Sequence, residues 1–420
     1  MKQHLGVCKK YQKAKEKQPQ VQPQVQLPAA SASSSTPIRI FSQSTLTPAA
    51  SNSEKNAILD RLAARVCYED ARPFTLYDTP AMRTLLAEIA PYWQPPSAFR
   101  IANDLLDSEF NAIQQQVNNV LQQTNHWNIV IDGSKDSSRH RTLNLVIHTI
   151  NGAFFWTQCV IDAVRESAEM ISNWLIDQLQ IATNDRFYLI NSLSTDTCNV
   201  NRAVYNLLDK SKQLSHALFI PCDAHGLQLL ILDIINAAFK EDFQQANNLV
   251  GWFDRSLKQL AALRDIQREV GKQLALVIAV KTRWGTQFGL IKRLLINKIA
   301  LKMYAVSDLD IEKTQQSYLD IINNEDFWTR LEAAAEILQP IDDALKEAEA
   351  DKSHLGLVYP RWRKIRAAFI DRKPCPFAPT KLLVDILDKR IRKQLFPIYY
   401  LAWLLMPNHK DQLKDQFLSL

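Results

Sequence analysis

Glycine is scarce in this sequence: there are 9 in 420 residues, about 2%, where globular proteins average about 7%. The two glycine-rich phosphate loops, GxxxxGK followed by Ser or Thr and GxGxxG, are absent, which argues against P-loop and Rossmann nucleotide-binding proteins. Long apolar runs are also lacking: the longest, Phe396 to Met406, has 11 residues, whereas a transmembrane helix needs about 18 or more. The N-terminus lacks the apolar segment of a secretory signal. We therefore expect no membrane partner.

The sequence also lacks closely spaced cysteine pairs, and it has no excess of basic residues after residue 57. The six cysteines are scattered and none forms a CxxC pair, which is typical of free thiols in a reducing compartment. Residues 1–57 hold eight basic and two acidic residues, the whole net charge of +6, and residues 58–420 are balanced. The sequence pI of 8.9 therefore comes from the first segment and is weak evidence for a nucleic-acid-binding body.

Composition and periodicity divide the chain into five parts. Residues 1–17 are a short basic piece. Residues 18–54 form a Gln/Pro/Ser/Ala tract with too little apolar surface to fold, so we predict a disordered linker. Apolar residues then recur at helical spacing, and residues 55–122 are predicted to form a small helical region, with a single helix near 98–122 at its end. Residues 123–280 are predicted to hold a sheet, and residues 281–420 to be all helical.

The predicted sheet begins with three consecutive strands, and the hairpin signal Asn151-Gly152 separates the second from the third. Strands are predicted at 126–132, 142–150, 153–161, 187–191 and 217–220, and helices at 166–182, 199–210 and 223–239. This order predicts a mixed sheet that starts as an antiparallel meander and continues by parallel crossovers. It is the order of a ribonuclease-H-like fold, in which the first and fourth strands are neighbours.

Beyond residue 241 the pattern is helical, and only VIAV at 277–280 is ambiguous. Helices are predicted near 243–254, 256–270, 285–305, 312–323, 326–350, 356–371, 379–394 and 410–419. The predicted fold class is therefore α/β plus all-α: a ribonuclease-H-like mixed sheet with a large helical insertion, preceded by a short helical region and a disordered tail.

Two acidic residues lie where the first and fourth strands are predicted to end. Asp132 ends the run IVID, and Asp196 follows the fourth predicted strand. Two carboxylates that converge at one sheet edge can hold two Mg²⁺ ions for in-line phosphoryl transfer, although a third acid usually completes such a site. The alternative is structural, since Asp132-Gly133 suits a turn and Asp196 suits a helix N-cap. Spacing alone favours the structural alternative.

Cys222-x-x-His225 lies where a strand is predicted to enter a helix. Two ligands do not make a zinc site, which needs four, or three and a water molecule. The favoured alternative is a buried thiol, with Asp223 capping the helix.

Arg283-Trp284 follows the ambiguous VIAV run, and an Arg beside an exposed Trp suits phosphate contact and base stacking. The alternative is a buried Trp that anchors the helical region on the sheet. His4-x3-Cys8 has the spacing of the second half of a zinc finger, but no CxxC precedes it, so no zinc is expected as the sequence is written.

Blocks along the chain together resemble a transposase of the hAT (hobo–Activator) superfamily, of the kind that carries a BED zinc finger. The similar blocks are HLGVCKKY (4–11), RPFTLYDTPAMRTLLAEIAPYWQPPS (72–97), IDGSKDSSRHRTLNLVIHT (131–149), TDTCNVNRAVYNLL (195–208), PCDAHGLQLLILDII (221–235), KTRWGTQF (281–288), PRWRKIR (360–366) and YLAWLLMP (400–407). The resemblance covers nearly the whole chain from residue 55 onward, and the order of the blocks carries it.

The resemblance implies roles for particular residues. Asp132 and Asp196 match the first two acids of the family's Asp-Asp-Glu triad, which holds Mg²⁺ or Mn²⁺ for DNA strand cleavage and transfer. Cys222 and His225 match the motif beside that site. DNA at the transposon ends is then the expected partner and the nucleus the expected location.

Arg283 and Trp284 match the pair that handles the flipped base and the hairpin intermediate in the family.

The sequence departs from the family's pattern near the two acids, in two places. The family's DGW is here DGS at residues 132–134, and the segment Ser192–Thr195 before the second acid is more polar than a core strand should be.

The third acid of the triad, a Glu, lies in the family on a helix after the insertion, before a dimerisation region. No candidate Glu after a closing strand precedes Leu420. The resemblance also implies that residues 1–17 are the remnant of a BED zinc finger whose front is missing. The resemblance therefore implies a chain clipped at both ends, with weak Mg²⁺ binding, no strand transfer and no family dimer. The alternatives are a domesticated DNA-binding or protein-interaction module without catalysis, or an active transposase whose ends are absent from this sequence.

Overall fold

The computed structural model describes residues 52–136, 138, 140–161, 167–271, 274–280, 285–307, 313–350 and 352–407. The chain divides into two compact units, Met1–Thr124 and Asn125–Leu420. The zinc-finger remnant predicted at 1–17, the predicted linker up to residue 51, the Arg283-Trp284 pair and the helix predicted at 410–419 lie outside the described residues.

The first unit is helical in its described part. Its elements are α2 (Asn52–Glu69), a 3-10 turn (Leu76–Asp78), α3 (Pro80–Ile89), α4 (Ala98–Ala102) and α5 (Asp104–Gln122). The first helix begins at Asn52 and so takes in the last residues of the predicted linker. The single helix expected near 98–122 is interrupted at Asn103, whose backbone angles, φ −127° and ψ −92°, are not helical.

Buried polar contacts hold this unit together. The Asp60 carboxylate accepts hydrogen bonds from the Trp93 indole at 2.8 Å and from Arg100 at 2.9 Å. The carboxylate of Glu109, on α5, pairs with Arg61 and Arg65, both on α2. Each buried acid thus has a donor from another part of the unit, as buried charges require.

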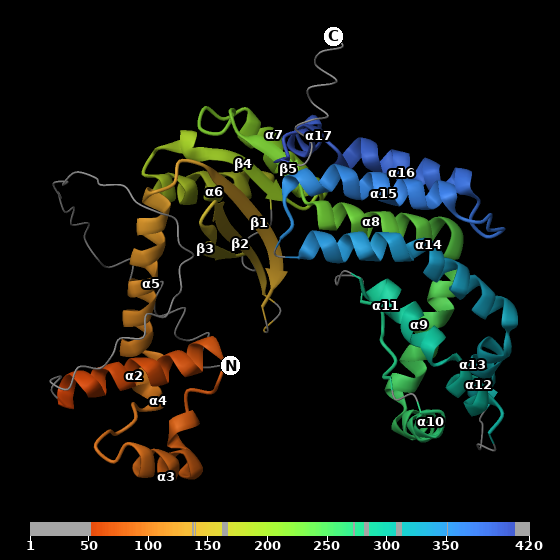
Figure 1. The fold of residues 1–420 in the computed structure, drawn as a ribbon, viewed down its shortest axis with the longest axis horizontal. Coiled ribbons are helices and arrows are strands. Elements are labelled where there is room, and N and C mark those ends of the chain that lie inside the picture. Colours follow the sequence, from red (N-terminus) through yellow and green to blue (C-terminus); the bar gives the residue numbers. More distant parts are fainter. Residues whose placement is uncertain are drawn as a thin grey trace. The chain divides into compact units, whose positions relative to one another are not determined.

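The second unit contains a five-stranded mixed sheet (Figure 1). Its strands are β1 (Trp127–Lys135), β2 (Arg141–Thr149), β3 (Gly152–Val160), β4 (Ile190–Thr195) and β5 (Leu218–Pro221), and α6 (Ala168–Thr183) and α7 (Asn199–Asp209) connect the later ones. The strand order is β3-β2-β1-β4-β5. β1, β2 and β3 pair antiparallel, and β4 is parallel to both β1 and β5. The predicted antiparallel meander followed by parallel crossovers is confirmed.

Alternation along the strands separates the two faces of the sheet. Ile129 and Ile131 are buried on one face of β1, whereas Val130 and Asp132, on the other face, are exposed. On β2 the same buried face carries Leu143, Leu145 and Ile147, which belong to the core. The face that bears Asp132 is therefore the one that solvent reaches.

The fourth strand exists as predicted, but its bounds differ. Residues 187–191 were expected, but Phe187–Leu189 form a 3-10 turn, and β4 covers Ile190–Thr195. The polar residues of β4 fit a core strand because the Ser192 hydroxyl donates a hydrogen bond to Asn128 Oδ1 at 2.8 Å, while Leu193 is fully buried. A buried hydroxyl is tolerated when it has such a partner. Asp196 consequently follows directly after the strand.

Helices make up the rest of the second unit. They are α8 (Asp223–Ile234), α9 (Lys240–Arg255), α10 (Leu257–Glu269), α11 (Thr286–Ile296), α12 (Lys298–Ala305), α13 (Lys313–Asn323), α14 (Glu325–Glu349), α15 (Val358–Asp371), α16 (Thr380–Gln394) and α17 (Pro397–Leu404). A π-helical turn at Ile235–Phe239 joins α8 to α9. The ambiguous run at 277–280 is neither helix nor strand, and α11 and α12 replace the single helix expected at 285–305.

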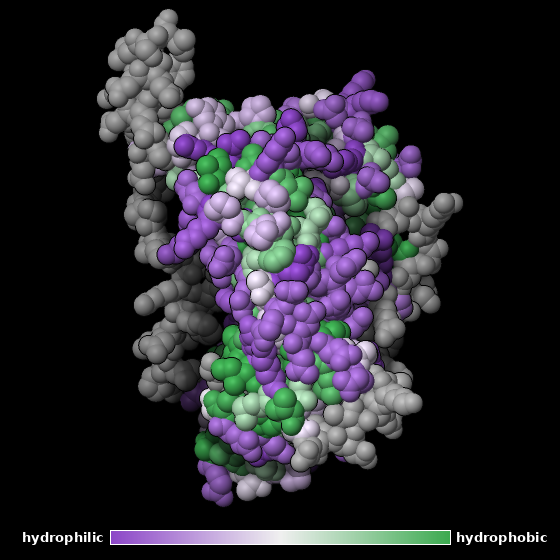
Figure 2. All heavy atoms as spheres, turned by 90° about the vertical axis from the view of Figure 1, so that its right-hand side faces the viewer, coloured by the Kyte–Doolittle hydropathy of each residue, from purple (hydrophilic) through white to green (hydrophobic). Residues whose placement is uncertain are grey.

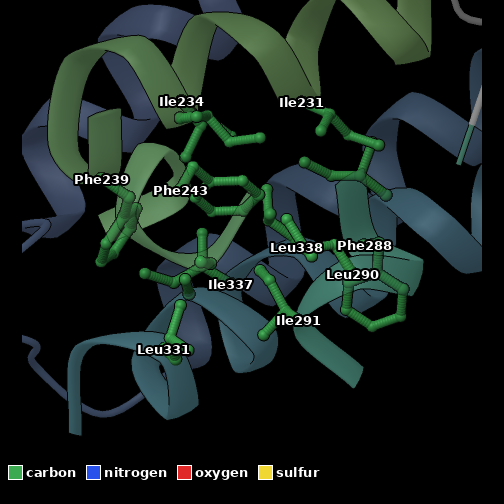
Figure 3. Close-up of a cluster of buried hydrophobic side chains, with 14 of the residues drawn as sticks. Ile231, Ile234, Phe239, Phe243, Phe288, Leu290, Ile291, Leu331, Ile337 and Leu338 are labelled. Atoms are coloured by element: carbon green, nitrogen blue, oxygen red, sulfur yellow. The ribbon is translucent and has the colours of Figure 1, made fainter. Parts of the chain in front are cut away.

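One apolar core runs through this helical region. Side chains of α8, α9, α11 and α14 converge there, including Ile234, Phe243, Phe288 and Leu338 (Figure 3). α8 lies alongside α14 and α16, and α15 packs on both of these (Figure 1). The helix that begins at the sheet edge is thus the central helix of the region, and this arrangement positions the candidate site.

The surface of the helical region is mostly hydrophilic on the face drawn in Figure 2, and hydrophobic residues gather mainly toward its lower end. Across the described residues, no helix combines the length and the apolar character that crossing a membrane requires.

Candidate functional site

The register of β1 and β4 places the two predicted acids side by side. The last parallel pair is Val130 with Ser194, and Asp132 and Asp196 each lie two residues further on. Asp132 does not end its strand as predicted, because β1 continues to Lys135 through its pairing with β2. The alternative that Asp132-Gly133 forms a turn is therefore wrong, since both residues are paired strand residues.

Asp196 is held by groups of its own connection to α7. Its Oδ1 accepts hydrogen bonds from the Cys198 backbone N–H at 3.0 Å and from Asn201 Nδ2 at 2.7 Å. Partial burial by itself raises the pKa of Asp196, but these hydrogen bonds and the nearby imidazole of His225 outweigh it and leave the pKa below its usual range. The N-cap alternative is also wrong, since Cys198 occupies the N-cap position of α7.

Asp132 has the opposite electrostatic balance. Partial desolvation of the carboxyl raises its pKa, and the negative charge of Asp196 raises it further, against a smaller lowering by the Gly133 N–H. Among the described residues, no Lys or Arg forms an ion pair with Asp132. The edge thus holds two neighbouring carboxylates. That of Asp196 is stabilised by hydrogen bonds, and that of Asp132 has no ion-pair partner among the described Lys and Arg residues.

Cys222 and His225 lie next to this pair, at the junction of β5 and α8. The Cys222 N–H donates to the Thr195 carbonyl at 2.9 Å, which ties the junction to the residue before Asp196. Burial lowers the pKa of His225, Asp196 opposes this, and the positive charge of Arg390 adds to it. The pKa of Cys222 is raised, mainly by burial and in part by the charge of Asp132. The structure therefore brings all four of these predicted residues together.

Asp223 does not cap α8 as the structural alternative proposed. Its carboxylate instead accepts hydrogen bonds from the guanidinium of Arg361 and from the Trp362 indole, the latter at 2.7 Å. Burial raises the pKa of Asp223, and these two donors counteract the rise. The sequence reasoning missed this contact because Arg361 and Trp362 are 138 and 139 residues away in the chain.

Two more helices contact the same junction. Gln394, at the end of α16, donates to the Cys222 carbonyl at 2.7 Å, and the Tyr399 hydroxyl, on α17, donates to the Pro221 carbonyl at 2.7 Å. Gly226 allows this close approach: a Cβ built there would lie 2.4 Å from Gln394 Cδ. Local sequence patterns carry no signal for these contacts.

Uncharged polar side chains extend the exposed face beside Asp132. Asn144 on β2 is the cross-strand partner of Asp132, and its Nδ2 donates to Ser134 Oγ at 3.1 Å. Ser134 Oγ also lies 2.7 Å from Thr142 Oγ1, within hydrogen-bond distance. These groups offer further donors and acceptors next to the acid pair.

The acid pair fits a hard divalent cation such as Mg²⁺ or Mn²⁺ in donor chemistry, because carboxylate oxygens are the ligands that these ions prefer. The negative charge of Asp196 repels that of Asp132 and raises the pKa of Asp132. A cation bound between the two carboxylates would offset this repulsion. Within the part of the chain that the structure describes, no group of three or more His, Cys, Asp and Glu side chains is placed to hold a metal ion. The fit is therefore to two protein ligands.

In a comparison with known protein families, residues 96–259 match the Domain of unknown function (DUF659). This domain is found in transposase-related proteins of the hAT type. The matched segment contains the whole sheet together with Asp132, Asp196, Cys222 and His225. Among curated proteins, no sequence matches the chain.

Proposed function

We propose that this chain derives from a hAT-type DNA transposase of the BED-finger kind, and that its sheet is a ribonuclease-H-like core. The sheet order β3-β2-β1-β4-β5, with β4 parallel to β1, supports this proposal because it makes the first and fourth strands neighbours. The DUF659 match over residues 96–259 supports it independently. In this reading, Asp132 and Asp196 are two acids of the ancestral active site.

The single observation that carries the proposal is the meeting of Asp132 and Asp196 at one edge, beside His225. When bound, Mg²⁺ or Mn²⁺ would stabilise charge on a scissile phosphate in DNA. Asp132 and Asp196 would hold the cation. Hydrogen bonds from Cys198 and Asn201 already fix the Asp196 carboxylate. Burial lowers the pKa of His225, which favours its neutral form.

Because the described residues group two carboxylates at this edge rather than three, we propose that the chain binds a divalent cation weakly and does not transfer DNA strands. The test is incubation of the purified chain with labelled hairpin-ended DNA and Mn²⁺, with Asp132→Asn as the matched variant. The expected result is no nicking above background in either protein. Mn²⁺-dependent nicking that is lost in Asp132→Asn would overturn the proposal and identify a working active site.

A second candidate is a DNA-binding or protein-interaction module without catalysis, which fits the grouping of two acids rather than three among the described residues. Binding dominated by phosphate contacts weakens steeply as salt increases, whereas docking between protein helices does not. Retardation of labelled DNA at about 50 mM salt that disappears at about 200 mM would support DNA binding. Absence of retardation at the lower salt concentration would contradict it. Location in the nucleus belongs to the same proposal.

A further inference from the structure

Two motifs that are far apart in the sequence meet in the structure at Asp223. One is the Cys-x-x-His block that starts α8, and the other is PRWRKIR at 360–366, on α15. Each carboxylate oxygen of Asp223 accepts a hydrogen bond, Oδ1 from Trp362 Nε1 and Oδ2 from Arg361. The Arg361 side chain is 1% exposed and that of Asp223 11%, so the ion pair is largely withdrawn from water.

A buried ion pair is a poor way to gain stability, because its desolvation penalty can exceed the Coulomb attraction. Replacing such a pair by apolar side chains of similar size often leaves the free energy of unfolding unchanged or increases it. What a buried pair with directed hydrogen bonds does provide is a fixed geometry. At Asp223 the fixed element is the first residue of α8, two residues before His225.

The backbone on the N-terminal side of Asp223 is fixed as well. Tyr399 on α17 binds the Pro221 carbonyl, and Gln394 on α16 binds the Cys222 carbonyl. Three consecutive residues, 221 to 223, thus receive hydrogen bonds from α15, α16 and α17. On the sheet side, Cys222 is bonded to Thr195 and the Ile220 carbonyl to Tyr205. The junction is held between the sheet edge and three helices.

We propose that Arg361, Trp362, Gln394 and Tyr399 are positioning residues, which fix the start of α8 against Thr195, the residue before Asp196. We call residues 220–223 and these four side chains the α8 joint. The helical region then determines the geometry of the candidate site, although none of its described residues belongs to the acid pair. A chemical role for this positioning rests on the proposed function. The positioning of α8 by these four side chains does not depend on it.

The test follows two backbone amide protons by NMR in the full chain: that of Cys222, bonded to the Thr195 carbonyl, and that of Cys198, bonded to the Asp196 carboxylate. Trp362→Phe removes the indole donor but keeps an aromatic ring at the site. A loosened joint should shift both amide signals, because the hydrogen bonds that hold these two protons change.

The matched control is Arg330→Lys, which weakens the pairing of Arg330 with the buried Asp242 elsewhere in the helical region. Both variants should lower the melting temperature, but only Trp362→Phe should shift the Cys222 and Cys198 amide signals. Gln394→Ala and Tyr399→Phe, which each remove one hydrogen bond, serve if Trp362→Phe does not fold, and both should shift the same two signals.

Unchanged Cys222 and Cys198 amide signals in the joint variants, with lowered melting temperatures, would overturn the proposal and leave the joint purely structural. Broadening of the Cys198 amide signal by added Mn²⁺, measured in the wild-type protein, reports separately on the proposed function. Signals that shift in the variants without any Mn²⁺ broadening in wild type would support the joint and contradict the cation site. Mn²⁺ broadening without signal shifts in the variants would do the reverse.

Discussion

Acidic side chains in the helical region and at the sheet edge have different surroundings. In the helical region, Asp242 binds Arg330 through both carboxylate oxygens, at 2.7 and 2.9 Å, and Asp223 binds Arg361 and Trp362. At the sheet edge, Asp132 faces the negative charge of Asp196, and no described Lys or Arg pairs with it.

The difference separates acids that hold the fold together from acids that are free to bind a ligand. A buried acid with an Arg partner has its charge compensated within the chain, so it needs nothing from outside. Two carboxylates at one edge repel each other, and an external cation or a proton relieves that repulsion. We therefore expect that breaking the pairing of a buried acid lowers stability, whereas removing the charge of a sheet-edge acid raises it and weakens the binding of divalent cations.

The largest expected effect comes from removing a counter-charge in the helical region. Arg330→Met leaves Asp242 buried without its partner, and the free energy of unfolding should fall by about 3–5 kcal/mol. The Ala238 carbonyl at the π-helical turn also loses its hydrogen bond from Arg330. Urea denaturation measures the loss, and the double variant Arg330→Met/Asp242→Leu should recover a large part of it. Equal stability of Arg330→Met and wild type would contradict the structural role of the pair.

A smaller effect is expected where α8 approaches α16. Gly226→Ala places a methyl group against Gln394, and overpacking of this kind costs about 1–3 kcal/mol. The double variant Gly226→Ala/Gln394→Ala provides room for the methyl group, so it should be less destabilised than the two single losses added together. Strictly additive losses in thermal unfolding would show that the two side chains do not compete for the same space.

The smallest effect, and one of opposite sign, is expected at the sheet edge. The folded-state pKa of Asp132 is raised, so the folded protein retains the proton over a pH range in which the unfolded chain has lost it. Ionised Asp132 therefore lowers stability once the pH rises above its unfolded pKa of about 3.9, and fully so above the folded pKa.

Asp132→Asn removes this penalty and should raise the stability of the cation-free protein at pH 7 by a few tenths of a kcal/mol, because solvent screens the exposed carboxylate. The gain should vanish near pH 3, where both states are protonated. Thermal melts of wild type and variant at the two pH values measure it. A loss of stability at pH 7 would mean that Asp132 is a structural acid like Asp223.

The sheet could be predicted from the sequence because its signals are local: alternating residues, a hairpin dipeptide and helices between the later strands. The error at β4 arose because Ser192 fits the core only through its bond to Asn128, a partner 64 residues away. At the site, the parallel neighbours β1 and β4 brought Asp132 and Asp196 together as expected. The role of Asp223 was not predictable, because its partners lie on helices whose packing no local pattern encodes.

The most direct test of the account is Mn²⁺ binding, followed by the loss of the free Mn²⁺ signal in electron paramagnetic resonance titrations of wild type, Asp132→Asn, Asp196→Asn and the control Asp177→Asn. Asp177 lies exposed on α6, within the same unit. The account predicts one weak class of site in wild type and in the control, with affinity reduced about tenfold or more, equivalent to about 1.4 kcal/mol, in each sheet-edge variant. Identical titrations for all four proteins would contradict the claim that the two acids form a cation site.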